Sequence, residues 1–450
     1  MPMRKVPVQK FDGDDENLLK FRGDSILALS TLIYALILTL VQAEIIVMNV
    51  PQIRSLVANI AASIDLYEST GSEEFLVDAR EDTTRLARAL ENPRDAIVKL
   101  FFAPSVLVIA KIAHDMEIFT LLSRATVPVP LSELAALKPA DPILVERIMR
   151  LLVANGFAEE PVQCEYLPTA ISKEMVQRGS VALVETLAIH FLTYIQKLPE
   201  YLKAINYRNP DDPLFAPFQY CHNVTVDAFT WLSQSSDTLK RFNSFMEGYR
   251  RNRPHWSDWF PIRERILDSQ VLDKDKPLLV DIGAGRGYDL MKFRSRFPDV
   301  PGRLILQDLP TVIDEIRGAY DLKAAGVETI AFDFFADVQP VKDAGVYYLK
   351  SVLHDWPDTK AALILNNIKQ AMKPGYSKLI IEEFILPDTN APSLACMTDL
   401  AVMIFSSGLE RNRQRWSDLM TLTGLRILQF WVSRGDGMEI IEAEFSEADQ

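Results

Sequence analysis

The stretch LLVDIGAGRGYD, residues 278–289, constrains the fold of this chain more than any other. Its apolar residues run directly into Gly283, Gly285 and Gly287, a pattern typical of a buried strand that turns sharply into a helix. Such a turn lets the backbone approach part of a nucleotide cofactor closely. The spacing is GxGxG, and Tyr288 stands where the dinucleotide-binding fingerprint GxGxxG has its last glycine.

From residue 277 onward the pattern alternates between strands and helices. Strands are predicted at residues 278–283, 303–307, 327–332, 345–349 and 377–383. Helices between successive strands predict a parallel, doubly wound α/β sheet. Near the end of the chain, LRILQFWV and MEIIEAEF flank the short turn SRGDG, which predicts an antiparallel hairpin. The expected fold is therefore a Rossmann-like sheet that ends in an antiparallel strand pair.

The preceding segment, residues 52–265, has apolar residues at helical spacing. Two helices at residues 131–138 and 142–156, followed by a hairpin-like stretch at 157–169, have the order of a winged helix. A nucleic-acid partner is disfavoured because these elements are rich in acidic residues and the chain carries a net charge of −13. We expect a mostly helical dimerisation or lid domain with a winged-helix-like part at 108–170.

We divide the 450 residues into an N-terminal extension (1–51), the helical domain (52–265) and a catalytic domain (266–450). The extension contains 19 uncharged residues at 25–43, long enough to span a bilayer as a helix. Two interpretations of the apolar segment 25–48 stay open: a membrane anchor, or a helix buried in a dimer. Three scattered cysteines without a CxxC motif suit a reducing compartment. We therefore expect a cytoplasmic protein, with membrane anchoring by this helix as the alternative.

Residues 207–262 are rich in proline and aromatic side chains and predict an irregular connection. Such a stretch can line a pocket for a flat apolar ligand. It can equally cover an interface between domains, and the sequence does not separate these interpretations.

Polar residues follow the predicted strands on the side where ligands bind in open α/β sheets. Asp308 ends the second strand, where a carboxylate can accept both hydroxyls of a ribose. Asp333 and Phe334 follow the third strand, and an acid beside an aromatic ring suits an adenine. His354 and Asp355 follow the fourth strand, which places the imidazole on the reactive rim of the sheet.

Two carboxylates further along the chain support a catalytic role for this histidine. Glu383 ends the next predicted strand, and Glu410 lies in SSGLERNRQRW. Together they could hold the tautomer of His354 and raise its basicity. The sequence contains no cluster with metal-ligand spacing, so we predict no metal.

The C-terminal part resembles the S-adenosylmethionine-dependent O-methyltransferases of the caffeate/flavonoid and fungal polyketide type, and most of all the fungal branch. The matching stretches are LVDIGAGRGYDL, LQDLPTVI, FDFF, YYLKSVLHDWPD, AMKPGYSKLIIEEFILPD and SGLERNRQRWSDLMTLTGLRI. Upstream, YRNPDDPLFAPFQY and FMEGYRRNRPHW also match, so the resemblance covers about residues 52–434. The first fifty residues are an addition to the family pattern, and ERN stands where ERT is more usual.

The resemblance implies the class I methyltransferase fold, S-adenosyl-L-methionine as cofactor and a homodimer. It implies that His354 is the catalytic base, flanked by Glu383 and Glu410, with Asp355 beside it in the HDW motif. The cofactor positions that it implies are Asp281, Gly283, Gly285, Asp308, Leu309, Asp333, Phe334 and Lys350, the last largely through its backbone.

We therefore expect methyl transfer to a hydroxyl group of an aromatic or polyketide-derived secondary metabolite. A base in contact with a phenol helps because such a hydroxyl, with a pKa near 10, is mostly protonated at neutral pH. The alternative is a pericyclase or dehydratase of the same branch that binds S-adenosylmethionine without transferring its methyl group. The glycine spacing and the C-terminal hairpin disfavour a third class, the nicotinamide dehydrogenases.

Overall fold

The computed structural model describes residues 49–186, 190–251, 254–268, 272–319, 322–433 and 438–445. The apolar segment 25–48, for which a membrane anchor or a dimer helix was expected, lies outside these residues. The chain divides into two compact units, residues 1–70 with 78–102 and residues 71–77 with 103–450. The described helices of the first unit are α2 (Val50–Thr70), most of α3 (Glu74–Leu90) and the start of α4 (Pro93–Asp115).

The second unit begins with short helices around a small antiparallel sheet. The helices are α5 (Ile118–Leu122), α6 (Leu131–Leu137), α7 (Pro142–Ala154), α8 (Ala170–Glu174) and α9 (Arg178–Thr186). The strands are β1 (Val129–Pro130), β2 (Ala158–Val162) and β3 (Glu165–Pro168), in the order β1-β3-β2. Asp141 caps α7 by accepting the backbone N–H of Ile143, and Pro142 occupies the first helical position, which favours a start there. The two helices and the hairpin predicted for this region are therefore present.

The aromatic-rich segment 207–262 is more regular than the sequence predicts. After α10 (Leu192–Ala204) come α11 (Pro217–His222), α12 (Ala228–Ser233), α13 (Ser236–Arg251) and α14 (Trp256–Trp259). The prediction of an irregular connection is wrong for most of it. In α13 the apolar residues Leu239, Phe242 and Met246 have helical spacing, but charged residues between them obscure the pattern.

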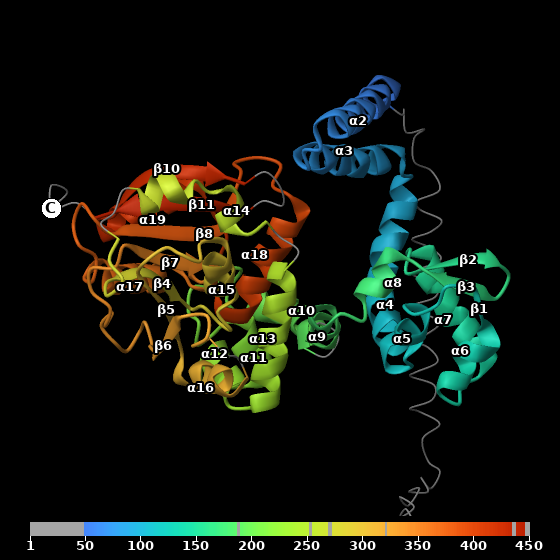
Figure 1. The fold of residues 1–450 in the computed structure, drawn as a ribbon. Helices are drawn as coiled ribbons and strands as arrows, with labels where there is room; N and C mark the ends of the chain where they lie inside the picture. Colours follow the sequence, from blue (N-terminus) through green and yellow to red (C-terminus); the bar gives the residue numbers. More distant parts are fainter. Residues whose placement is uncertain are drawn as a thin grey trace, which may run out of the picture. The chain divides into compact units, whose positions relative to one another are not determined.

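The catalytic part is built on the predicted sheet (Figure 1). Its strands are β4 (Pro277–Ile282), β5 (Arg303–Asp308), β6 (Val327–Ala331), β7 (Val346–Lys350), β8 (Lys378–Leu386), β10 (Arg426–Val432) and β11 (Met438–Glu444), with the short β9 (Arg411–Asn412) beside β8. Their order is β10-β11-β8-β7-β4-β5-β6. Strands β4 to β8 pair in parallel, and β10 and β11 are antiparallel. This order confirms the class I methyltransferase sheet with its C-terminal hairpin.

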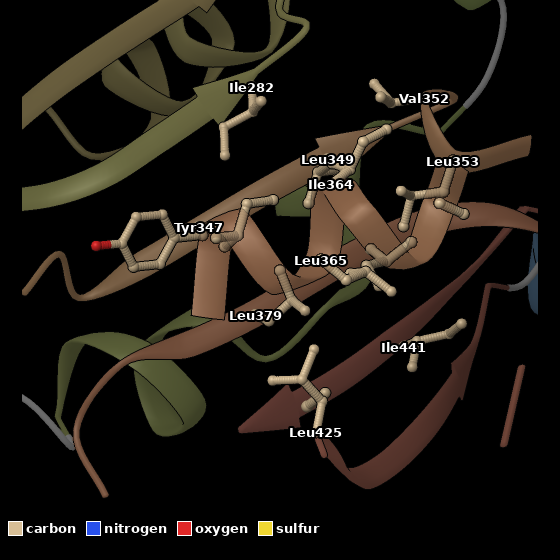
Figure 2. Close-up of a cluster of buried hydrophobic side chains, with 14 of the residues drawn as sticks. Ile282, Tyr347, Leu349, Val352, Leu353, Ile364, Leu365, Leu379, Leu425 and Ile441 are labelled. Atoms are coloured by element: carbon tan, nitrogen blue, oxygen red, sulfur yellow. The ribbon is translucent and has the colours of Figure 1, made fainter. Parts of the chain in front are cut away.

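Hydrophobic residues cover both faces of the sheet. The surrounding helices are α15 (Tyr288–Arg296), α16 (Pro310–Ala319), α17 (Asp358–Lys369), α18 (Ser393–Ser406) and α19 (Arg413–Thr423), with the short turns η3 (Arg263–Leu267) and η4 (Leu353–Asp355). On one face, Leu349 and Leu379 pack with Ile364 of α17, and Figure 2 shows that this core reaches Val352 and Leu353. The residues directly before His354 are therefore anchored in the core.

The chain reverses its direction across the sheet beside β4. Strands β5 and β6 extend the sheet on one side of β4, and the chain then returns to place β7 on the other side. In open α/β sheets, ligands bind beyond the carboxyl ends of the strands at such a switch point. The turns after β4 and β7 are therefore where a binding site is expected.

Candidate active site

The glycine turn after β4 has the backbone conformation that its sequence predicts. Gly283, Gly285 and Gly287 have φ of 71°, 57° and 76°, in the left-handed region that side chains disfavour. A Cβ on Gly283 would lie 2.8 Å from Cγ2 of Val352, and a Cβ on Gly287 would lie 2.6 Å from a Leu306 methyl group. A Cβ on Gly285 would meet nothing within 4 Å, because this glycine borders open space.

Asp308, at the end of β5, is fixed to this turn. Its Oδ2 accepts the backbone N–H of Gly285 at 2.7 Å, and its Oδ1 accepts the N–H of Leu309 at 2.8 Å. The next strand ends in a similar arrangement, because Oδ1 of Asp333 accepts the N–H of Phe335 at 2.8 Å. Both carboxylates are therefore oriented by backbone groups at the carboxyl edge of the sheet.

A cavity of about 310 Å³ lies over these strand ends. Its lining includes seven of the residues predicted to form the site: Gly283, Gly285, Asp308, Leu309, Asp333, Phe334 and Asp355. Aromatic and aliphatic side chains from the segment 213–247 and from the HDW motif complete much of the lining, including Phe229, Phe242 and Trp356. The part of the segment 207–262 that lines the cavity therefore fits the pocket interpretation of that stretch.

The donors and acceptors of this cavity fit S-adenosylmethionine. The open space beside Gly285 lets a ligand approach the backbone, and Asp308 offers a carboxylate to ribose hydroxyls next to it. Asp333 and Phe334 line the same cavity one strand further along, where a polar edge and a flat face suit an adenine. The three side chains therefore suit the adenosine part of the cofactor, as the resemblance implies.

Two predicted cofactor residues, Asp281 and Lys350, lie beneath this surface and do not line the cavity. The Lys350 ammonium is 3.0 Å from Oδ1 of Asp289 and 3.4 Å from Oε1 of Glu382. Nε2 of His255, which lies upstream of the sheet, is 3.1 Å from the same Asp289 oxygen. These side chains form a buried charge network below the glycine turn, which we call the lower network.

The predicted catalytic residues come together beside the cavity. His354 is buried in η4, and its Nδ1 lies 2.8 Å from Oε1 of Glu410 and 3.6 Å from Oε2 of Glu383. Its Nε2 lies 3.7 Å from Oδ1 of Asp355, which lines the cavity. We call these four side chains the catalytic cluster. A hydrogen bond from Nδ1–H to Glu410 would leave the Nε2 lone pair on the side of Asp355.

Glu383 also fixes the backbone that carries the histidine. Its Oε1 accepts the backbone N–H groups of Val352, Leu353 and His354 at 3.0, 2.9 and 3.3 Å. Ser351, just before them, has a φ of 51°, an uncommon conformation for a residue with a side chain. The glutamate therefore satisfies the donors of a strained turn at the position where the imidazole must be placed.

The charges of the cluster shift its proton affinities. Burial alone lowers the pKa of His354, but Glu383, Glu410 and Asp355 outweigh it and hold this pKa well above its ordinary 6.5. Burial raises the pKa of Glu383 to about 7, against the opposing effect of the His354 cation. Burial therefore brings the pKa of Glu383 near neutral pH, and the three carboxylates make His354 more basic, which is a property that a general base requires.

The same atoms bear on the prediction that no metal is present. Among the described residues, His354, Glu383 and Glu410 are a set whose ligand atoms lie within 4.8 Å of one another. The 2.8 Å separation of Nδ1 and Oε1 is that of a hydrogen bond, which a proton between the two atoms explains. The absence of a metal stays a prediction.

Sequence reasoning missed the residues that hold the HDW turn from its other side. Arg411, fully buried, donates to the carbonyl oxygens of Leu353 and Trp356 at 3.0 and 2.8 Å. A Cβ on Gly408 would lie 2.1 Å from the carbonyl oxygen of His354, so this position requires glycine. Both residues are in the SGLER stretch that drew attention to Glu410. A glycine and an arginine this close to Glu410 in the sequence are the signal that could have identified them.

Comparison with protein families gives two matches along the chain. Residues 98–178 match the model of the O-methyltransferase dimerisation domain. Residues 203–426 match that of the O-methyltransferase domain, which includes β4 to β9 and the whole catalytic cluster.

Individual proteins agree with these matches. The O-methyltransferase asqD of Emericella nidulans is 36% identical over 344 residues, 76% of this chain and 87% of that protein. Demethylsterigmatocystin 6-O-methyltransferase of Aspergillus flavus is 34% identical over 336 residues, 74% of this chain and 84% of that enzyme. LepI in complex with S-adenosylmethionine has a TM-score of 0.78 and 25% identity, covering 87% of this chain and 99% of LepI.

The strand order of the sheet, the cavity over its glycine turn and these matches agree with one another. Two homologues, 36% and 34% identical over the aligned residues, carry the name O-methyltransferase. The fold is also that of a chain solved with S-adenosylmethionine. The protein belongs to the S-adenosylmethionine-dependent O-methyltransferases.

Proposed function

We propose that this enzyme methylates a phenolic hydroxyl of an aromatic, polyketide-derived metabolite, with His354 as the general base. The observation that carries the proposal is the 2.8 Å contact between Nδ1 of His354 and Glu410. This contact orients the imidazole with Nε2 free to accept a proton. The name of the relative demethylsterigmatocystin 6-O-methyltransferase supports an aromatic polyketide as the substrate class.

The roles of the other residues follow from their positions. The bound cofactor supplies an electrophilic methyl group on a sulfonium. Nε2 of His354 accepts the phenol proton, and Glu410 stabilises the imidazolium that forms. Glu383 holds the turn, while Asp355 lies at the boundary between Nε2 and the cavity. The apolar lining around Phe229 and Trp356 makes the cavity less polar than water, which favours a reaction in which phenolate and sulfonium charges cancel.

The first experiment incubates the purified enzyme with methyl-labelled S-adenosylmethionine and a panel of hydroxylated aromatic polyketides. His354→Ala should lower turnover by about 10²- to 10⁴-fold, the usual contribution of general base catalysis. His114→Ala is the matched control, since His114 lies on α4 outside the cavity lining and should leave turnover unchanged. Label transfer that survives in His354→Ala would contradict the assigned base.

A second candidate function is cofactor-assisted pericyclic chemistry without methyl transfer. The specific observation in its favour is the likeness to a solved structure described as a pericyclic reaction enzyme, with a TM-score of 0.78 and 25% identity. The same panel separates the two functions, because pericyclic chemistry consumes the substrate without releasing S-adenosylhomocysteine. The complete catalytic cluster around His354 favours methyl transfer.

We further propose that the enzyme is a homodimer and that the division at residues 51/52 and 265/266 reflects its domains. The dimerisation-domain match includes α4 from residue 98, where Leu100, Phe101 and Phe102 are 74%, 74% and 58% exposed. Among the described helices, α4 is also the one long and apolar enough to cross a membrane. Its place in the dimerisation domain favours burial against a second copy. Light scattering should give twice the mass of the chain.

We propose a cytoplasmic location, with the segment 25–48 as an additional membrane contact. The segment is apolar enough for such a contact, and the cysteines, all unpaired, suit a reducing compartment. Fractionation of cells that produce the full chain or a chain without residues 1–48 tests this. Membrane association that is unchanged by the deletion would contradict a role for the segment.

A further inference from the structure

Helix α13 presents one of its faces to the cofactor cavity. Leu239, Phe242, Asn243, Met246 and Glu247 all line the cavity. Their spacing of three and four residues places them on a single side of the helix. This side, which we call the α13 wall, therefore forms one boundary of the space assigned to the cofactor.

Arg286, from the glycine turn, joins this wall to the rest of the site. Its buried guanidinium places Nη1 3.2 Å from Oε2 of Glu247 and 3.4 Å from Oγ of Ser244, both on α13. Its Nη2 and Nε donate to Oε1 of Glu315 on α16 at 2.6 and 3.1 Å. Asn243 of the wall donates to the other oxygen of Glu315 at 2.6 Å. One guanidinium thus links the cofactor turn, α13 and α16.

The helix is held differently on the side of α9. A Cβ built on Gly179 of α9 would lie 2.3 Å from Cα of Gly248, and a Cβ on Gly248 would lie 2.3 Å from Cα of Gly179. The two backbones therefore touch with no room for a side chain. Nε of Arg178 also donates to Oγ of Ser244 at 3.2 Å. Helices α9 and α13 consequently pack as one unit.

The two attachments of α13 differ in what it takes to break them. Separation of α9 from α13 would open a close backbone contact and leave a void that no side chain fills. Separation of α13 from the glycine turn breaks polar contacts that water can replace, and the Glu247 side chain is already 22% exposed. Of the two attachments, the contact between Arg286 and Glu247 is therefore the one that water can replace more easily.

We propose that Arg286 is a positioning residue that holds α13 against the cofactor turn, so that the cofactor and its demethylated product exchange only when the contact with Glu247 breaks. The proposal rests on the cavity being the cofactor site, and it concerns exchange rather than the methyl-transfer step. Neither Arg286 nor Glu247 belongs to the catalytic cluster. Their loss should therefore affect cofactor binding more than the pH dependence set by His354.

The test uses S-adenosylhomocysteine and the full-length enzyme without methyl acceptor. Glu247→Gln removes one charge of the contact and keeps the shape of the side chain. We expect S-adenosylhomocysteine to dissociate about tenfold faster in stopped-flow displacement, since that factor corresponds to ~1.4 kcal/mol, close to the lower end of what one charged hydrogen bond contributes. Amide hydrogen exchange of the α13 wall in the ligand-free enzyme should rise as well. The matched control is Glu328→Gln, which breaks the ion pair of Arg303 and Glu328 between β5 and β6 away from the cavity.

A second variant guards against loss of folding. Arg286→Lys keeps the charge but lacks the fork that contacts Glu247 and Glu315 together. It should accelerate release at least as much as Glu247→Gln, and the double variant should be no faster than Arg286→Lys alone, because both changes remove the same contact.

The possible results distinguish the role of Arg286 from the cofactor site on which that role depends. Faster release with raised exchange of the α13 wall supports the role of Arg286. Unchanged release and exchange in both variants, with S-adenosylhomocysteine still bound, overturns that role and leaves the proposed function intact. Failure of the wild-type enzyme to bind S-adenosylhomocysteine at all overturns the cofactor site itself and the role of Arg286 with it.

Discussion

Glu382 and Glu383 are neighbours on β8, both fully buried, yet they belong to different regions of the molecule. Because side chains alternate along a strand, they point to opposite faces of the sheet. Glu383 lies in the catalytic cluster, where its oxygens contact the turn and the imidazole of His354. Glu382 lies in the lower network, where it contacts the Lys350 ammonium and the hydroxyl of Tyr348.

The balance of charge distinguishes the two environments. Three carboxylates surround one imidazole in the catalytic cluster, and burial raises the pKa of Glu383 to about 7. Burial also raises the pKa of Glu382, but the Lys350 cation counteracts it within the network. A proton can therefore move between the carboxylates and the imidazole of the catalytic cluster. In the lower network, the Lys350 ammonium neutralises the buried carboxylates instead. The partners of a buried acid, rather than its burial, therefore decide whether it can take part in chemistry.

The largest change that we predict is in the unfolding free energy of the protein, when the lower network loses its cation. Lys350→Met keeps the length of the side chain but leaves Glu382 and Asp289 without the ammonium that lies 3.4 and 3.0 Å from them. Removal of one partner from a buried ion pair costs about 3–5 kcal/mol of unfolding free energy. Urea unfolding measures the change. Arg303→Met is the control, because it breaks an exposed pair and should cost at most about 1 kcal/mol. Equal losses of unfolding free energy in the two variants would contradict the conclusion that Lys350 neutralises the buried acids of the lower network.

The second prediction is that Glu383 and Glu382 differ in their effect on kcat. Glu383→Gln weakens both the hold on the turn and the charge beside His354, so kcat should fall about tenfold to a hundredfold, a fraction of what general base catalysis contributes. Glu382→Gln should reduce the unfolding free energy and leave kcat nearly unchanged at a temperature where both variants are folded. Steady-state kinetics at saturating cofactor tests the pair. A greater loss of kcat in Glu382→Gln would reverse the assignment of the two faces.

The sequence predicts this division only in part. The strands β4 to β8, the hairpin and the cavity positions of Asp308, Asp333 and Phe334 follow from apolar periodicity and from the rule that ligands bind beyond strand ends. Alternation along β8 can place Glu382 and Glu383 on opposite faces, but not identify the partners of each. His255 joins the network from a segment upstream of the sheet, and such long-range contacts have no local signature. The role of α13 as a cavity wall is not predicted either, because charged residues between its apolar ones obscure the helical pattern.

The third effect concerns the pH dependence of the catalytic cluster. The carboxylates raise the pKa of His354, so the unprotonated base required for catalysis is lost as pH falls through this raised pKa. Glu410→Gln removes the carboxylate 2.8 Å from Nδ1, which should lower the pKa of His354 and move the acid limb of kcat/KM to lower pH by about one unit. The plateau should fall too, because the imidazolium loses a stabilising charge. Glu382→Gln should leave the limb in place, and a limb that moves to higher pH in Glu410→Gln would contradict the assigned base.

We expect the smallest change in activity from a substitution in the lower network that tests whether this network influences catalysis. The hydroxyl of Tyr348 donates to Oε2 of Glu382, and burial raises the pKa of this phenol well above its ordinary value, so it remains a donor. Tyr348→Phe removes the hydrogen bond but keeps the ring that stacks on Trp256 at 4.9 Å between centroids. The unfolding free energy should fall by about 1.5–3 kcal/mol, the usual contribution of one hydrogen bond to a charged group. Because Lys350 still neutralises Glu382, we expect kcat and its pH profile to match the wild type. A shifted profile would mean that the two faces of β8 exchange charge after all, and that the catalytic cluster extends through the sheet.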